Sequence, residues 1–157
     1  MAGRVVASIF AFVLLLLALQ VGPWLLTGDL GVAAREILNG PVPARLVAVI
    51  DGDTIAVEAQ VWLGQKLAIK VRLQGVDAPE LKGRCQRERD LAVQARDFVR
   101  QQFGQGPVRL ADVHYGKYAG RVVARVITAT GADLGQQLLT AGLARPYQGG
   151  ARQSWCS

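Results

Sequence analysis

The strictest constraint on the fold is an alternation of apolar and polar residues from Ile69 to Gln74. Ile69, Val71 and Leu73 are apolar, and the residues between and after them are polar. Successive side chains of a strand point to opposite faces, so a period of two predicts a half-buried β-strand. Such a strand needs a sheet around it, and its polar face can carry a charged group such as Arg72.

Four further runs have the composition of strands, and a tight turn separates the first two. Residues 45–50 are β-branched and apolar, and 54–58 resume the pattern after the Asp51-Gly52 pair. That pair is typical of a turn, because Gly tolerates a positive φ and Asp bonds its own backbone. The pattern predicts a hairpin with Asp53 at the start of the returning strand. The later runs are 108–113 and 121–128.

Two helices are expected beside the sheet. Residues Gln86 to Phe103 repeat apolar side chains at helical spacing, which predicts a buried stripe with Glu88 on the opposite, solvent-exposed face. A shorter helix is expected from Asp133 to Gly142, because Asp133 followed by Gln136 matches a capping box. The buried stripe of the first helix is Leu91, Ala95, Phe98, Val99 and Phe103.

The N-terminus combines a basic residue with a long apolar stretch. Arg4 precedes an uninterrupted apolar run from Val5 to Leu19, and after Gln20 the apolar residues continue to Leu26. This pattern is typical of an export signal, and the whole span is long enough to cross a bilayer. A cleaved signal peptide and an uncleaved membrane anchor are both compatible with it. Either one predicts an extracytoplasmic location, whether membrane-anchored, periplasmic or secreted.

The expected domain organisation follows from this start. Residues 1–26 form the signal peptide or transmembrane anchor, and 27–43 form a linker marked by Gly and Pro. Residues 44–157 are enough for one small domain with its own core. The formal net charge of +6 favours polyanionic partners, nucleic acid and anionic lipid alike.

Three carboxylates and two arginines concentrate in one stretch of the chain. Asp53 follows the first turn, and Asp77 and Glu80 flank a proline whose fixed φ makes a rigid corner. Grouped carboxylates are costly without a cation. Arg72 and Arg121 carry planar guanidinium groups, which suit phosphate. The set therefore predicts phosphodiester chemistry assisted by a hard divalent cation.

Four stretches of the chain carry a family resemblance: V-I-D-G-D-T (49–54), V-R-L-Q-G-V-D-A-P-E (71–80), K-Y-A-G-R-V-V-A-R-V (117–126) and D-L-G-Q-Q-L-L-T-A-G-L-A-R (133–145). With them, the chain from about Ala44 to Tyr147 resembles the thermonuclease (staphylococcal nuclease-like) family. The resemblance implies an α+β fold, mainly β, in which a five-stranded OB-type barrel packs against two helices, here preceded by the N-terminal hydrophobic helix. It also implies a nuclease that cuts DNA and RNA with calcium. Residues 148–157 are too few for the third helix of the family's best-known members, so no such helix is expected there.

The resemblance also implies a metal site. Asp53 and Asp77 would be the side-chain ligands of Ca²⁺, and the backbone carbonyl of Ala78 would be a third ligand. Asp51 would lie just behind them. Calcium prefers six to eight oxygen ligands, so these groups with added waters suffice.

The resemblance implies the catalytic residues as well. Glu80 would orient or deprotonate the attacking water, and Arg72 and Arg121 would bind the scissile phosphate. Loss of either arginine is then expected to harm catalysis more than folding. Lys117 and Tyr118 are candidates for contacting the nucleotide, although one extra residue separates them from the arginine compared with the usual family pattern.

Two cysteines and one histidine have open interpretations. Cys85 and Cys156 either form a disulfide that holds the tail near the acidic loop or remain two unpaired thiols. His114 is expected to lie in a solvent-exposed turn without a catalytic role. The basic cluster Lys82, Arg84, Arg87 and Arg89 either follows a nucleic-acid backbone or is a solvated helix start.

Three functions remain compatible with the sequence. The first is a calcium-dependent nuclease of the cell envelope that cuts DNA and RNA with little sequence preference. The second is an OB-type module that binds nucleic acid without cutting it, and the third is a membrane-tethered scaffold. Fold alone does not separate them. The combined carboxylates and arginines favour the nuclease, and no obligate protein partner is implied.

Overall fold

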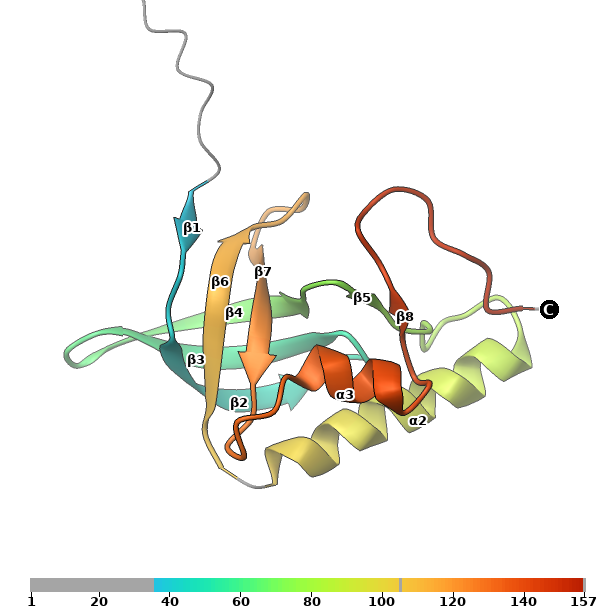
Figure 1. The fold of residues 1–157 in the computed structure, drawn as a ribbon, viewed down its shortest axis with the longest axis horizontal. Helices are drawn as coiled ribbons and strands as arrows, with labels where there is room; N and C mark the ends of the chain where they lie inside the picture. Colours follow the sequence, from blue (N-terminus) through green and yellow to red (C-terminus); the bar gives the residue numbers. More distant parts are fainter. Residues whose placement is uncertain (1–35, 105, 157) are drawn as a thin grey trace, which may run out of the picture. The chain divides into compact units, whose positions relative to one another are not determined.

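The computed structural model describes residues 36–104 and 106–156, and five strands close into a barrel at its centre (Figure 1). Around the ring, β2 pairs with β3, β3 with β4, β4 with β7, β7 with β6 and β6 with β2. The β4–β7 pair is parallel and the other ring pairs are antiparallel. With its helices, the ring forms the expected OB-type α+β fold. The ring strands are β2 (Val42–Val49), β3 (Thr54–Trp62), β4 (Gln65–Leu73), β6 (Val108–Tyr115) and β7 (Arg121–Ile127).

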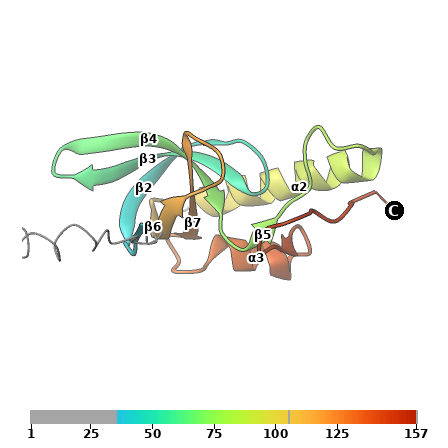
Figure 2. The same ribbon diagram turned by 90° about the horizontal axis from the view of Figure 1, so that it is seen from above.

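Two helices run side by side against the barrel (Figures 1 and 2). The Gln137 side-chain amide donates to Gln102 Oε1 across them at 3.4 Å. Asp133 caps the shorter helix by accepting the N–H of Gln136 at 3.2 Å, as its sequence predicts. Short strand pairs complete the fold, β1 with β6 and β5 with β8. These elements are α2 (Gln86–Phe103), α3 (Leu134–Thr140), β1 (Ile37–Leu38), β5 (Val76–Asp77) and β8 (Arg145–Pro146).

The core fills the barrel and continues beneath both helices. Each fully buried aliphatic side chain stabilises the fold by roughly 1.5–3 kcal/mol, so the ring is a firm support for residues at its strand ends. The predicted bounds of α2 are confirmed. Its buried face differs in detail, because Ala92 is buried where Leu91 is only half-buried. The fully buried side chains of the core include Ile55, Val57, Val71, Val99, Leu110, Val126, Leu134 and Leu138.

Gly52 lets the first turn approach its neighbours closely. A Cβ atom at this position would lie 2.7 Å from the Ala95 Cβ on α2 and 2.8 Å from the Ala78 Cβ. No side chain fits in that space, so glycine is required for the turn to pack between the helix and the corner at Ala78. The same packing brings Asp53, the next residue, beside that corner.

Three sequence predictions need correction. Glu88 is buried, with 8% of its surface exposed, although it was expected on the exposed face of α2. His114 lies within β6 and is half-buried, because the strand continues past the expected turn to Tyr115. Residues 37–38 and 42–43 belong to strands, where Gly and Pro had indicated irregular structure.

The apolar N-terminal segment, 1–26, lies outside the described residues. Among the helices that the structure describes, none is long and apolar enough to cross a membrane.

Candidate active site

Asp53 lies immediately before β3, with 3% of its surface exposed. Its Oδ1 accepts hydrogen bonds from the Arg72 guanidinium and from Thr54 Oγ1, the latter at 3.0 Å. Its Oδ2 accepts the Ala78 N–H at 2.9 Å. The Asp53 N–H in turn donates to Asp51 Oδ1 at 3.0 Å, which fixes the turn. The carboxylate is therefore held from both sides, and Asp51 lies behind it as expected.

Arg72 joins the two acidic segments of the site. It lies on β4, in register with Thr54 of β3, so its side chain starts beside Asp53. Its Nη2 donates to Asp77 Oδ1 at 3.2 Å and to the Val76 carbonyl at 3.3 Å. Only 9% of this side chain is exposed. Both terminal nitrogen atoms of Arg72 therefore donate to protein acceptors. The resemblance, by contrast, predicts that they bind a phosphate.

Burial raises the pKa of the Asp53 carboxyl above its ordinary value, and the charge of Asp51 adds to the rise. The Arg72 guanidinium and the Ala78 N–H act in the opposite direction, because both favour the charged form. The raised pKa shows that the existing partners do not fully offset the loss of water around this carboxylate.

Arg152, from the C-terminal tail, is the second guanidinium of the site. Its Nε lies 3.0 Å from Asp77 Oδ1, and its Nη1 forms an ion pair with Glu80 Oε1. The Asp77 side chain is 6% exposed and that of Glu80 is 47% exposed. The structure therefore brings the predicted residues Asp53, Asp77 and Glu80 into one cluster and adds an arginine that was not predicted.

The donor set fits a hard divalent cation. Three linked carboxylates face two guanidinium groups, so a net negative charge remains when all are ionised. Among the described residues, Asp77 Oδ2 and the Ala78 carbonyl oxygen accept no hydrogen bond. Asp53, Asp77 and Ala78 together offer oxygen atoms only, which suits calcium or magnesium better than a thiol-seeking metal.

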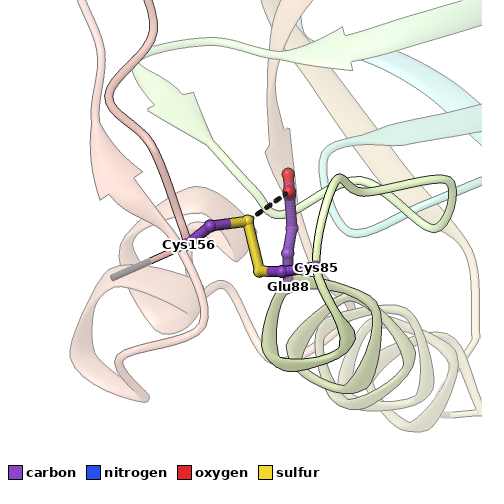
Figure 3. A group of neighbouring side chains, drawn as sticks. All are labelled: Cys85, Glu88 and Cys156. Atoms are coloured by element: carbon purple, nitrogen blue, oxygen red, sulfur yellow. Dashed lines mark hydrogen bonds between the residues drawn. A yellow bond between two sulfur atoms is a disulfide. The ribbon is translucent and has the colours of Figure 1, made fainter.

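A second group of possible ligands fits a metal less well. Cys85, Glu88 and Cys156 lie close together, but the two sulfur atoms form a disulfide (Figure 3). Disulfide sulfur is not the thiolate that metals bind. This group therefore serves as a structural link.

Glu88 holds the loop that carries Glu80. Its Oε2 accepts the Arg84 N–H at 2.9 Å, and its Oε1 lies 3.5 Å from the Glu80 backbone nitrogen. Oε2 also lies 3.5 Å from Cys156 Sγ (Figure 3). Beside this loop a pocket of about 290 Å³ opens onto Asp77 and Glu80, and basic residues, including Lys82 and Arg84, line its wall.

The C-terminal tail closes the other side of that pocket. Figures 1 and 2 show it leaving β8 and running back past β5 towards the first turn of α2. The Cys85–Cys156 disulfide fixes its end, with a Cα–Cα distance of 5.8 Å. Trp155 is buried beneath Arg145, whose Cζ lies 3.9 Å from the indole ring centroid. Cys85 and Cys156 therefore form a disulfide, which is the first of the two alternatives that the sequence left open.

Arg121 lies on the same face of the sheet as Arg72, one strand away. It opens β7 and pairs with Lys70 of β4, which is two residues from Arg72 and so points the same way. Its guanidinium has no hydrogen-bond or ion-pair partner among the described residues, and its Nε is enclosed. Its Cζ lies 5.1 Å from the Tyr118 ring centroid, and both Tyr118 and Lys117 are exposed.

Sequence patterns did not identify Arg152 or Glu88 as parts of the site. Glu88 stands at the third helical position after the N-cap Cys85, where glutamate often binds backbone N–H groups, and that signal was available. Arg152 has no comparable local signal. Its place depends on the path of the tail, which the disulfide determines.

Comparison with known proteins identifies the family of this chain. A family model described as staphylococcal nuclease homologue matches residues 70–154, more than half of the chain. The match contains Arg72, Asp77, Glu80 and Arg121, whereas Asp53 precedes it and reaches the site through the fold. No curated protein matches the chain significantly. The chain belongs to the family of staphylococcal nuclease homologues.

Proposed function

We propose that this protein is a calcium-dependent nuclease that hydrolyses DNA and RNA with little sequence specificity. The observation that carries the proposal is the joining of Asp53 and Asp77 by Arg72, with Glu80 in the same cluster. Membership of the nuclease-like family supports a nucleic-acid substrate. A net charge of +6 also favours a polyanion.

Asp53, Asp77 and the Ala78 carbonyl would hold the calcium ion. When bound, calcium would act as a Lewis acid towards a phosphoryl oxygen. Glu80 would accept the proton of the attacking water, since its carboxylate is half-exposed and reaches solvent. Its Oε2 is without a hydrogen-bond partner among the described residues and is the atom available for that proton.

Arg121 would bind the scissile phosphate. Its guanidinium has no hydrogen-bond or ion-pair partner among the described residues, so it can offer two N–H groups to two phosphate oxygens. Arg72 would contribute positive charge near the phosphate while it holds the Asp53 and Asp77 carboxylates in place. Lys117 and Tyr118 would contact the neighbouring nucleotide. A preorganised donor such as the Arg121 guanidinium contributes about 3–4 kcal/mol to stabilisation of the transition state in comparable sites.

We further propose an extracytoplasmic location for the domain. The Cys85–Cys156 disulfide supports it, because disulfides persist outside the reducing cytoplasm. The apolar N-terminal residues, 1–26, would direct export as a signal peptide or remain as a membrane anchor. An anchored form would also contact the membrane through that segment.

The test uses the full chain, purified in a mild detergent under oxidising conditions. Digestion of single-stranded DNA and of RNA is followed with calcium, with EDTA, and with the variants Glu80→Gln and Arg121→Ala. The expected result is cleavage that requires calcium and falls by at least about a hundredfold in each variant.

Other outcomes separate the remaining functions. A folded protein that binds nucleic acid without cutting it would be a binding module. A folded protein that neither cuts nor binds would be a scaffold, and the nuclease proposal would be wrong in both cases.

A further inference from the structure

Arg152 contacts both Asp77 and Glu80, yet the proposed reaction gives it no task. We propose that Arg152 is a positioning residue, which fixes the Glu80 carboxylate beside Asp77 so that its free oxygen meets the attacking water. This inference rests on the nuclease function proposed above. It concerns how the same site is assembled.

The contact is made by two different nitrogen atoms of one planar group. Nε binds Asp77 Oδ1 at 3.0 Å, and Nη1 binds Glu80 Oε1. Because the guanidinium is rigid, the two carboxylates are held at a fixed separation. Arg72 already holds Asp77 in place. Arg152 therefore positions Glu80 relative to a carboxylate that is itself fixed.

Glu80 needs this support. Its side chain is 47% exposed, and Arg152 is its hydrogen-bond partner among the described residues. An exposed glutamate without a partner occupies several rotamers. Arg152 takes Oε1 and leaves Oε2, so it orients the carboxylate without blocking the atom that would receive the proton.

The tail holds Arg152 in place from both ends. On one side β8 pairs with β5, so Arg145 lies opposite Asp77 itself. On the other side Arg145 Nη1 donates to the Ser154 carbonyl at 2.9 Å, and Cys156 is bonded to Cys85. Arg152 is therefore anchored against the same two segments that carry the residues it contacts.

The experiment measures kcat and KM of the full-length protein on single-stranded DNA at saturating calcium. Arg152→Ala should lower kcat by about ten- to hundredfold, as expected for a misplaced catalytic group, and leave KM within about twofold. Arg152→Lys should recover part of the lost kcat, because it keeps the positive charge. The recovery should be incomplete, because lysine lacks the planar guanidinium that contacts both carboxylates. Arg109→Ala is the control, since Arg109 is exposed on β6 and its side chain makes no hydrogen bond or ion pair among the described residues.

A double-substitution cycle tests whether Arg152 acts through Glu80. In the Glu80→Gln background, Arg152→Ala should have little further effect on kcat, since the group it positions is already lost. Calcium affinity, measured by titration calorimetry without nucleic acid, should stay the same in Arg152→Ala.

Four results would overturn the inference. Equal kcat losses in both backgrounds would show that Arg152 acts independently of Glu80. Calcium binding that becomes more than about tenfold tighter, a gain of roughly 1.4 kcal/mol, would show that the tail competes with the metal. If Arg152→Ala cleaves as fast as the wild type, the positioning role is wrong and the nuclease proposal stands. If the wild type itself does not cleave, both proposals are wrong.

Discussion

Arg72 is a buried guanidinium whose charge is balanced by Asp53 on one side and Asp77 on the other. Removing one member of such a group leaves uncompensated charge in a poorly hydrated place, which is strongly destabilising. The structure therefore gives Arg72 a part in folding that the sequence did not suggest. The Arg121 side chain makes no hydrogen bond or ion pair among the described residues, and its proposed role is to bind phosphate.

Arg72→Ala should lower the free energy of unfolding by about 3–5 kcal/mol, because two buried carboxylates lose their counter-ion. Urea denaturation in EDTA measures it. Arg121→Ala is the matched control and should change stability by less than about 1 kcal/mol. Equal stabilities of the two variants would contradict the structural role of Arg72.

Glu88→Ala should destabilise the protein by about 1–3 kcal/mol, because backbone N–H groups of the 80–84 loop lose their acceptor. Hydrogen exchange should also become faster at Arg84. Asp90→Ala, which removes an exposed carboxylate from the same helix, is the control and should leave both properties nearly unchanged. Unaltered exchange in Glu88→Ala would mean that another group holds the loop.

At the level of elements, the tail after β8 depends on its disulfide. The Cys85→Ser/Cys156→Ser double variant should be about 4 kcal/mol less stable, from the chain entropy of a loop with a sequence separation of 71. Its residues 148–156 should exchange faster with solvent. A reductant should bring the wild type to the same stability and leave the double variant unchanged; a reductant that acts equally on both would point to another cause.

The elements differ in how far the sequence predicts them. α2 and the alternating part of β4 follow from local periodicity, because one buried face imposes a period of 3.6 or of two. β1 has two residues and exists through its pairing with β6, far away in the chain. No local pattern indicates such a strand.

The same division applies to the site. Asp53, Asp77 and Glu80 stand in recognisable motifs next to a turn and a proline, so their proximity could be expected. Arg152 comes from a tail without periodicity, so no local pattern predicts its position. For Glu88, helical spacing predicts the exposed face of α2, which is wrong. Spacing describes packing against the core, whereas Glu88 is buried against the loop before its own helix.

For the whole molecule, calcium should act as a stabilising ligand. Binding to the folded state alone adds about 2.7 kcal/mol at a hundredfold excess over Kd, which corresponds to a Tm increase on the order of 10 °C. Differential scanning calorimetry with calcium and with EDTA tests this. Asp77→Asn should abolish most of the increase, and identical Tm values for the wild type in both buffers would argue against a calcium site.

The disulfide also closes a covalent ring that contains α2, β6, β7, α3 and β8. A protease that cuts between α2 and β6 opens this ring without dividing the protein. β2, β3 and β4 would then belong to one fragment, and β6 and β7 to the other, while the two fragments stay covalently joined until a reductant is added. After such a cut, the covalent continuity of the molecule depends on a sulfur–sulfur bond and on the redox conditions around it.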